Sequence, residues 1–457
     1  MKKVLITLAI VMVASTAAIL VIVSGASRDI PEPDVSDLAV DRPDIAPENN
    51  AYTYFVSATN TFHWPISSTD ISDYLEGNVT TTATLADIFA KNIDTFDLIN
   101  RGLECEKCIT PEVTGFDTLL PYVGFWRNMV RVLAAKSKHD RLAERYTDAT
   151  DACISLLRFA DLIQRDAEGI IIYLVGISIL DFGLAQARDL VQDKGTPEDE
   201  LGRISSTLAD LGPFAPGLIR AIKVEYKVVG NTIEDFAAGK FSIDDLTSLG
   251  GTGSPSILKR KGIPRYFFKP NTTKQTFAEY FRHMTTNAPL SFAEMNLYDV
   301  EGVLGLNNNT IEFLIQPNGV GKILYALLLP ALDRVLDRKC RAECSVAATQ
   351  LLAAVLAYER KNGILPATLD DLVPVYLSAI PEDPYDGKPF RYDSSNAIIY
   401  SVGEDLVDAD GSSKLLSGDA TDSPERQRWN SEDIVFPIRN EIQHVTVPIP
   451  SEDASSE

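Results

Sequence analysis

Apolar residues recur at helical spacing through the N-terminal half of the chain. In residues 144–167, ERYTDATDACISLLRFADLIQRDA, small and apolar side chains return every three or four positions, as expected for one face of a helix. Glycines and prolines around 166–169, 195–197 and 212–216 separate further helical stretches. The pattern predicts an all-α domain of antiparallel helices over 51–249, with no sheet in 51–240. The face in 144–167 comprises Ala149, Ala152, Cys153, Leu156, Leu157, Ala160 and Ile163.

One internal stretch is apolar on every side. Residues 169–180, GIIIYLVGISIL, lie between Glu168 and Asp181 and carry no charge. A helix that crosses a bilayer needs roughly 20 apolar residues, so this run is too short to span a membrane. A helix that is apolar all round is usually buried in a protein core. We therefore expect a buried helix here.

The pattern changes in the C-terminal third. Residues 341–361 read as an amphipathic helix that ends at Asn362-Gly363. Two short runs, 390–392 and 398–402, are then typical of strands. The order predicts an α+β domain over 336–440, with one long helix packed on a small antiparallel sheet. Residues 250–335, which begin with the glycine-rich GGTGSPS, are expected to form a mixed connecting region.

The N-terminus predicts export. No residue from Val4 to Ser27 is charged, which is long enough to cross a bilayer. Lys2 and Lys3 favour a cytoplasmic N-terminus. We therefore expect residues 1–27 to be a signal anchor in the inner membrane, spanning it through 4–25, with the body in the periplasm or extracytoplasmic space. The alternative is a cleaved signal with its site near Ser24-Gly25-Ala26.

Composition agrees with an exported, soluble body. The chain has 42 basic and 64 acidic residues, a net charge of −22, which argues against nucleic acid and anionic lipid as partners. Hydrophobic residues make up 45%, enough for real cores. Residues 28–50 are rich in proline and aspartate and predict a linker that lifts the body off the membrane. Residues 441–457 predict an acidic, disordered tail. The fold class predicted is therefore multidomain.

Five cysteines allow three interpretations. Cys105 and Cys108 form CEKC, and Cys340 and Cys344 are four residues apart. Export favours structural disulfides, inert buried thiols come next, and a thiolate metal site or redox chemistry follows. Cys153 lies in the apolar stripe of its predicted helix and is expected in the core.

The usual catalytic motifs are absent. Residues 318–322, NGVGK, look like a phosphate-binding loop, but Gln316 and Ile323 stand where that loop needs glycine and serine or threonine. None of the four histidines lies in an HExxH pair, and there is no GxSxG sequence. The sequence leaves enzymatic activity uncertain and favours a non-catalytic protein.

A set of C-terminal residues follows a recognisable order: Tyr358, Gly363, Pro366, Leu369, Leu372, the turn Asp383-Pro384-Tyr385-Asp386-Gly387, Tyr392, Gly403-Glu404-Asp405 and Asp433-Ile434. This order resembles the globular head of the major pseudopilin of type II secretion systems. The resemblance covers roughly 341–440 and implies a long helix, a small sheet and a calcium-binding loop. It departs from the family at the N-terminus, because the apolar segment contains no glutamate and lies about 310 residues before the head. Polymerisation through that helix therefore does not carry over. The whole chain also looks like large exported bacterial proteins of unknown function.

The calcium that the resemblance implies would lie in the acidic loop 400–413, YSVGEDLVDADGSS. Asp405, Asp408 and Asp410 supply three carboxylates, and Asp433 returns from the closing strand as a fourth. Calcium takes 6–8 oxygen ligands, which converging carboxylates can provide. The loop does not fit an EF-hand, since Leu406 and Ser417 occupy ligand positions. The alternative is a solvated acidic loop.

Two classes of function follow. The first is a membrane-anchored, non-catalytic extracytoplasmic protein with a pseudopilin-like head, a binding or structural component of an envelope or secretion assembly. The second is an exported hydrolase or ligand-binding protein with its site in the helical domain.

Overall fold

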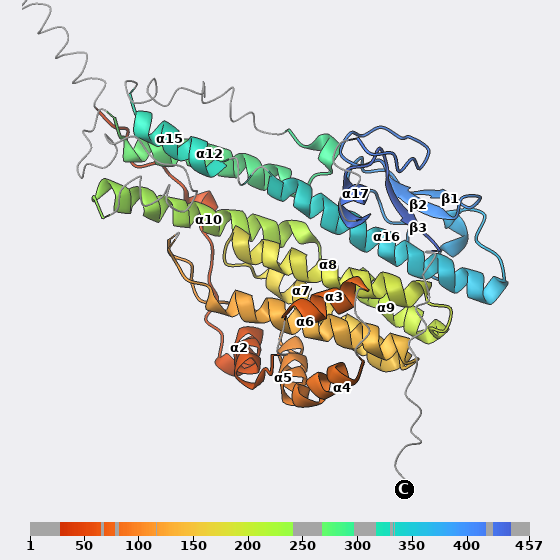
Figure 1. Cartoon of the computed structure of the whole chain (residues 1–457). Helices are drawn as coiled ribbons and strands as arrows, with labels where there is room; N and C mark the ends of the chain where they lie inside the picture. The colour runs from red at the N-terminus through yellow and green to blue at the C-terminus, as the bar shows by residue number, and fades with distance from the viewer. Residues whose placement is uncertain are drawn as a thin grey trace, which may run out of the picture.

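The computed structural model describes residues 28–64, 68–77, 82–115, 117–240, 267–296, 317–329, 332, 334–416 and 424–439. The predicted membrane segment 1–27 and the predicted tail 441–457 lie outside this range. Within it the protein is mostly helical, with one small antiparallel sheet near the C-terminus (Figure 1). The coarse prediction of helices followed by a helix-and-sheet unit is therefore confirmed.

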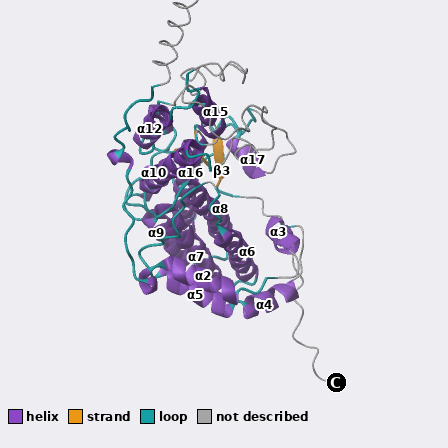
Figure 2. Cartoon of the chain, turned by 90° about the vertical axis from the view of Figure 1, so that its left-hand side faces the viewer, coloured by secondary structure: helices purple, strands orange, loops and turns teal. Residues whose placement is uncertain are grey.

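Long helices form the centre of the molecule. They are α6 (Pro121–Leu142), α7 (Tyr146–Arg165), α8 (Ile170–Gln192), α9 (Glu198–Asp210) and α10 (Phe214–Ala237). Four shorter helices come before them in the chain: α2 (Ala51–Thr61), α3 (Ser68–Glu76), α4 (Thr82–Lys91) and α5 (Ile93–Leu103). Figure 2 shows α2, α4 and α5 below the long helices and α3 beside α6. The described residues of 51–240 contain no strand, as the helical periodicity predicts.

Helix α7 buries the face that the sequence pattern predicts, including Cys153 and Leu157. Helix α8 contains the apolar run 169–180 and packs against α6, α7, α10 and α16 (Arg334–Asn362). Both α8 and α16 are long and apolar enough to cross a membrane by length and composition, yet most of each lies inside the protein. The expectation that 169–180 forms a buried helix is confirmed.

Small residues allow three helices to meet closely around Gln164 at the end of α7. A side chain on Gly176 of α8 would come within 2.8 Å of the Gln164 backbone nitrogen. A side chain on Gly217 of α10 would overlap the Gln164 carbonyl oxygen. Only glycine lets these helix backbones approach so closely, because it has no Cβ.

The C-terminal unit consists of α16 and a three-stranded sheet. The strands β1 (Arg391–Asp393), β2 (Ile398–Ser401) and β3 (Ile434–Pro437) pair antiparallel in the order β1-β2-β3. Ile399 in the central strand faces Tyr392 on one side and Phe436 on the other. A short helix, α17 (Pro424–Trp429), packs on β3. The unit also contains the 3₁₀ helix η6 (Leu369–Leu372).

One hydrophobic core runs through both predicted domains. Helix α16 packs along α8 and α9, so residues of 51–240 and of 336–440 share a single buried cluster. At the end of α16 the Arg360 guanidinium donates to the carbonyl oxygens of Val191, at 3.2 Å, and Asp193, at 2.7 Å. It also donates to the carbonyl of Thr196. The domain boundaries stay predictions, but no gap in packing marks them.

Part of the predicted connecting region packs on the helices. Its described parts form α12 (Pro270–Asn287), the 3₁₀ helix η4 (Phe292–Glu294) and α15 (Gly319–Leu328). The sequence NGVGK starts α15, where Asn318 Oδ1 accepts a hydrogen bond of 2.9 Å from Lys269 N–H. Gly321 lies so close to Thr273 and Asn318 that a Cβ would overlap both. Close packing therefore explains the glycine that resembled a phosphate loop.

The segment 28–50 is not a free spacer, which corrects the sequence interpretation. It lies against α10 and α12 and includes two 3₁₀ helices, η1 (Ser36–Leu38) and η2 (Pro47–Asn49). Asp29 accepts hydrogen bonds from the backbone N–H groups of Asn271, at 2.8 Å, and Thr272, at 3.0 Å, in the first turn of α12. Asp37 pairs with Arg282 at 2.7 Å. The acidic residues of this segment therefore bind the N-terminus of α12 and form ion pairs, instead of facing solvent.

Candidate functional site

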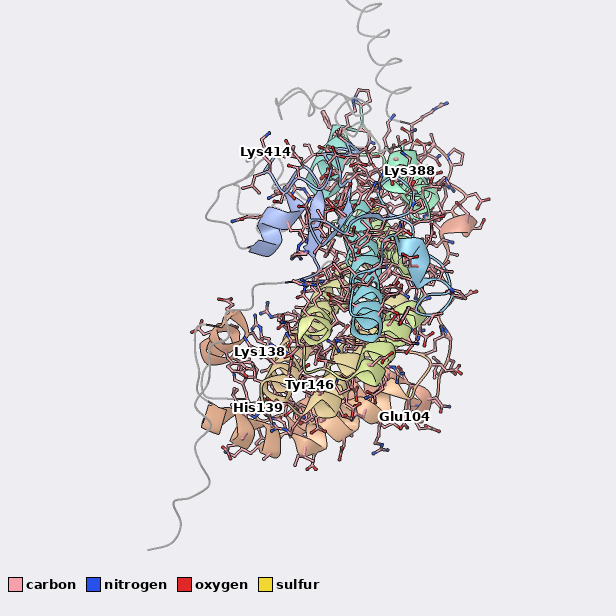
Figure 3. The ribbon with its side chains drawn as sticks, turned by 90° about the vertical axis from the view of Figure 1, so that its right-hand side faces the viewer. Glu104, Lys138, His139, Tyr146, Lys388 and Lys414 are labelled. Atoms are coloured by element: carbon pink, nitrogen blue, oxygen red, sulfur yellow. The ribbon has the colours of Figure 1, made fainter. Side chains whose placement is uncertain are left out.

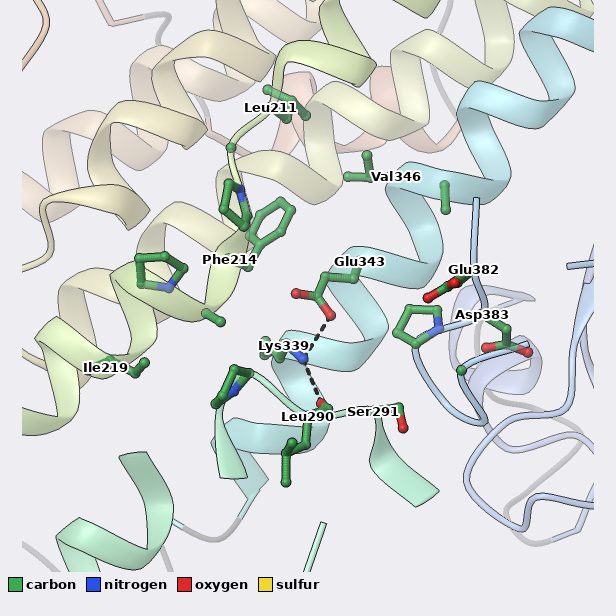
Figure 4. A pocket seen from close by; sticks show the side chains of 18 of the residues that line it. Leu211, Phe214, Ile219, Leu290, Ser291, Lys339, Glu343, Val346, Glu382 and Asp383 are labelled. Atoms are coloured by element: carbon green, nitrogen blue, oxygen red, sulfur yellow. Dashed lines mark hydrogen bonds and ion pairs between the residues drawn. The ribbon is translucent and has the colours of Figure 1, made fainter. Parts of the chain in front are cut away.

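A cleft of about 600 Å³ opens where four segments meet. It lies between the start of α10, residues 289–291 after α12, the first half of α16, and the turn 382–387 (Figure 4). The side formed by the end of α9 and the start of α10 is apolar and includes Leu211, Phe214 and Ile219. The opposite side carries charged groups from α16 and the turn. The cleft therefore presents an apolar wall and a polar wall to one ligand, as small-ligand and peptide sites do.

Lys339 and Glu343 form a partly buried ion pair on the polar wall. The Lys339 side chain is 3% exposed, and its Nζ lies 2.9 Å from Glu343 Oε2. Nζ also donates to the Leu290 carbonyl oxygen at 3.1 Å (Figure 4). The two residues are four apart on α16, so they share one helix face. The Lys339 ammonium is neutralised by Glu343 and held by the Leu290 carbonyl. Glu343 is therefore the charged group of this pair that faces the opening of the cleft.

The unsatisfied polar groups of the cleft are acceptors or neutral. Only one Glu343 oxygen pairs with Lys339, and the other points toward α10 in Figure 4. Burial raises the pKa of Glu343, and the Lys339 cation opposes that rise. Within the part of the chain that the structure describes, no hydrogen bond or ion pair engages the side chains of Glu382 or Gln350, which also line the cleft. This surplus of carboxylate oxygen favours a cationic or hydrogen-bond-donating ligand.

Asp383 supports the turn beneath the cleft. Its buried carboxylate accepts from Tyr385 N–H at 3.0 Å, Ser401 Oγ at 2.8 Å and Val402 N–H at 3.1 Å. Arg391 Nη1 lies 3.0 Å away and completes the shell. Burial raises the pKa of Asp383, while these hydrogen bonds lower it. The predicted turn 383–387 is confirmed, and Gly387 adopts the positive φ of 70° that such a turn requires.

The turn also joins the cleft wall that precedes η4. The N–H of Phe292 donates to Pro384 O at 2.9 Å, and the N–H of Ala293 donates to Tyr385 O at 2.7 Å. Tyr385 is buried, and its hydroxyl donates to Asp337 of α16 at 3.3 Å. The polar wall is thus fixed by bonds between segments far apart in the sequence.

Sequence reasoning did not find this cleft. Its residues come from four separate segments, and none forms a local motif. A charged Lys339 and Glu343 four apart on a helix normally indicate a solvated face. The only available signal was their position within a helix whose other residues are mostly apolar.

The structure places the predicted calcium ligands in an arrangement that the sequence did not predict. The carboxylate of Asp433 is buried and accepts hydrogen bonds from the backbone N–H groups of Ala409, at 3.1 Å, Gly411, at 2.7 Å, and Ser412, at 3.2 Å. Burial raises the pKa of Asp433, and these donors oppose the rise. The loop therefore folds its N–H groups around an internal carboxylate.

The other three carboxylates have separate partners or none. Asp405 accepts from Val407 N–H at 3.0 Å. Asp408 accepts from Asp410 N–H at 3.1 Å and lies 3.5 Å from Arg391 Nε. Asp410 is exposed and has a positive φ of 56°.

In the structure, the four predicted calcium ligands do not form one group of carboxylates. Over the described ranges, no group of three or more histidine, cysteine, aspartate or glutamate side chains is placed to hold a metal. The N–H groups of Ala409, Gly411 and Ser412 all donate to Oδ2 of Asp433, so a cation at that oxygen would compete with them. The calcium site stays a prediction.

All five cysteines are free thiols, so the favoured disulfides are not formed. Four of them are buried, and Cys153 lies in the core as predicted. Burial raises the pKa of Cys340 to about 12, with the Lys339 cation opposing. Burial also raises the pKa of Cys108. Protonated, enclosed thiols are poor nucleophiles and poor metal ligands, which agrees with the interpretation as inert buried thiols.

Comparisons with protein families, with characterised proteins and with solved structures found no match to this chain. The likeness to pseudopilin heads therefore rests on the sequence motifs alone.

Proposed function

We propose that the protein is a membrane-tethered, extracytoplasmic binding protein whose cleft holds a cationic, partly apolar segment of a partner protein. The observation that carries this proposal is the pairing of an apolar α10 wall with unneutralised carboxylate oxygens on α16 and the turn. A net charge of −22 adds long-range attraction for a basic partner. The partner belongs to an envelope or secretion assembly in this proposal, in keeping with the pseudopilin-like order of motifs.

The cleft favours binding over catalysis in this proposal. The charged side chains that line it are Lys339, Glu343, Glu382 and Asp383. Lys339 is held by two acceptors, and Asp383 is held by four donors. Glu343 and Glu382 are then the groups that meet a ligand. Two acceptors beside an apolar wall suit a lysine or arginine next to an apolar side chain.

The test uses fluorescent model peptides and the full chain in lipid nanodiscs. A peptide of alternating lysine and leucine should bind at least about tenfold more tightly than its glutamate counterpart, a difference of about 1.4 kcal/mol. Glu382→Gln should weaken the basic peptide severalfold. Glu104→Gln is the matched control, since Glu104 is exposed at the end of α5, far from the turn that carries Lys388 (Figure 3). Equal binding of both peptides, or an equal loss with both variants, would reject the cleft as the site.

The tether has its own test. Alkaline phosphatase fused after residue 457 should be active if residues 4–25 export the body, because the enzyme needs an oxidising compartment. An inactive fusion, beside an active cytoplasmic reporter at the same site, would place the body in the cytoplasm. The peptide measurement is independent of this result, so the two parts of the proposal can fail separately.

A further inference from the structure

A second cavity lies between the N-terminal segment and α10. It encloses about 350 Å³ and is lined by residues within 32–40, by one face of α10 and by Lys274 of α12. Figure 1 shows the N-terminal segment, in red, running from α12 across α10. The cleft of the proposed function lies at the start of α10, whereas this cavity follows residues 223–234 of the same helix. The cavity is therefore a separate candidate site.

The N-terminal segment gives the cavity an apolar wall. Pro33, Val35, Leu38 and Val40 line it. On the opposite wall Gly230 of α10 leaves open space, because a Cβ built there would meet no atom within 4 Å. A cavity with apolar walls and a few polar groups is typical of a small-molecule site.

Two of the three lysines that line the cavity are engaged by carboxylates. Lys274 lies 2.6 Å from a Glu234 oxygen and 3.4 Å from a Glu32 oxygen. Lys227 pairs with Glu112, which lies outside the lining. The charges of these two lysines are therefore neutralised within the protein.

The third lysine, Lys223, has no such partner. Among the residues that the structure describes, no hydrogen bond is made by its ammonium and no carboxylate lies within 4 Å of it. Hydrogen bonds from Arg282 lower the pKa of Asp37, and the charge of Lys223 contributes to this at longer range. Asp37 is itself held by Arg282 at 2.7 Å. Lys223 is therefore available to a carboxylate from outside the chain.

Tyr226 lies three residues after Lys223 on α10, so both side chains share the helix face that lines the cavity. Tyr226 is 7% exposed, and its ring packs edge-on against Phe281 with the ring centroids 5.8 Å apart. Burial raises the pKa of Tyr226 to about 12, so the hydroxyl keeps its proton at neutral pH and can donate. Within the described ranges this hydroxyl has no hydrogen-bond partner. A buried polar group normally has one, so an acceptor inside the cavity would satisfy it.

We propose that this cavity binds a small organic acid with an apolar body, whose carboxylate lies at the Lys223 ammonium and the Tyr226 hydroxyl. The apolar body packs against Val35, Leu38 and Val40. Hydrogen bonds to an ionised carboxylate are stronger than neutral ones, so the two donors provide the specificity. Because the cavity walls are the N-terminal segment and α10, the bound acid also holds that segment against the helix.

Three ligands with the same alkyl chain test the proposal. Octanoate, octanol and octylammonium are titrated into the full chain in lipid nanodiscs by calorimetry, with empty nanodiscs as the reference. Octanoate should bind at least about tenfold more tightly than octanol or octylammonium, because only octanoate accepts from both donors as an anion. Bound octanoate should also slow hydrogen exchange in residues 33–40. Equal binding of octanoate and octanol, or no binding of octanoate, would overturn the proposal.

Matched variants locate the site. Lys223→Gln and Tyr226→Phe should each weaken octanoate severalfold and leave octanol unchanged, a difference that a loss of folding would not produce. Lys194→Gln is the control, because Lys194 is an exposed lysine after α8 that does not line the cavity. Gly230→Leu should fill the open space and block octanoate without lowering the denaturation midpoint. If octanoate binds Gly230→Leu as tightly as wild type, or if Lys194→Gln weakens it as much as Lys223→Gln, the assignment to this cavity is wrong.

Discussion

The carboxylate of Asp433, just before the closing strand, accepts a hydrogen bond of 2.7 Å from the backbone N–H of Gly411 in the acidic loop. Gly411 has a φ of 78°, and Asp410 before it a φ of 56°, so successive N–H groups turn toward one anion. Concave sets of N–H groups of this kind bind anions in many proteins. The loop is thus organised by attraction between its backbone and one of its own predicted metal ligands.

Asp433→Ala should therefore loosen the loop. Three partly buried N–H donors lose their acceptor. A fully buried unsatisfied donor costs roughly 1–3 kcal/mol, and we expect a smaller cost for each of these. We expect faster hydrogen exchange in 405–416 and a lower denaturation midpoint. Asp410→Ala is the control, since its exposed carboxylate has no partner among the described residues. Similar exchange in the two variants would show that Asp433 does not hold the loop.

The hydrogen bonds of Asp433 and a calcium site at the same residues predict different melting behaviour. In this arrangement we expect millimolar calcium and chelator to give the same melting temperature, because Asp433 is engaged by N–H donors. Binding at a hundredfold excess over Kd would instead stabilise the protein by about 2.7 kcal/mol. A rise of several degrees with calcium and not magnesium, lost in Asp405→Asn, would establish the calcium site.

The contact around Gln164 predicts opposite effects for two glycine substitutions on one helix. Gly217→Ala places a methyl group against the Gln164 carbonyl, and such overpacking costs about 1–3 kcal/mol. Gly230→Ala, also on α10, meets nothing within 4 Å and should stabilise the helix by about 0.5–1 kcal/mol. Chemical denaturation of both variants checks the pair. A Gly217→Ala protein as stable as wild type would mean that α7 and α10 can separate without cost.

The Lys339–Glu343 pair predicts a pH effect whose sign is not obvious. Because burial raises the pKa of Glu343 against the pull of Lys339, the folded state keeps this proton where the unfolded chain has lost it. Stability from this group is therefore present at low pH and falls as pH rises through the raised pKa. Relative to wild type, Glu343→Gln should become more stable between pH 4 and pH 7.

Denaturation of both proteins across that range measures the difference. If the variant instead loses stability relative to wild type as pH rises, the attraction of Lys339 outweighs burial, and the pKa of Glu343 is lowered in the fold. Lys388→Gln provides a reference for a change in an exposed charge near the same turn.

The local elements could be predicted from the sequence because their signals are local. The apolar stripe of 144–167 corresponds to the buried face of α7. The predicted order of helix, turn and strands corresponds to α16 and the sheet that follows it. The turn at 383–387 followed from its proline and glycine. Each of these depends on residues within one or two turns of one another.

The contacts between segments could not be predicted in the same way. Asp433 was expected to face a cation because the loop resembles a calcium-binding loop, but the backbone angles at Asp410 and Gly411 turn N–H groups toward it. Residues 28–50 looked solvated because their partners on α12 lie more than 200 positions later. The cleft forms where four separate segments pack together, and no single segment has a sequence pattern that indicates it.

The hydrogen bonds of Asp29 to the first turn of α12 determine how mechanical load enters the protein. A pull on the chain at Arg28 reaches the backbone N–H groups of Asn271 and Thr272 first. The Glu32–Lys274 pair follows, and then the Asp37–Arg282 pair. These contacts lie in sequence along one helix, so tension directed away from α12 would break them one after another. Tension along the helix axis would load them together. The direction of pull would then decide whether the N-terminal segment peels away at low force or holds until α12 itself yields.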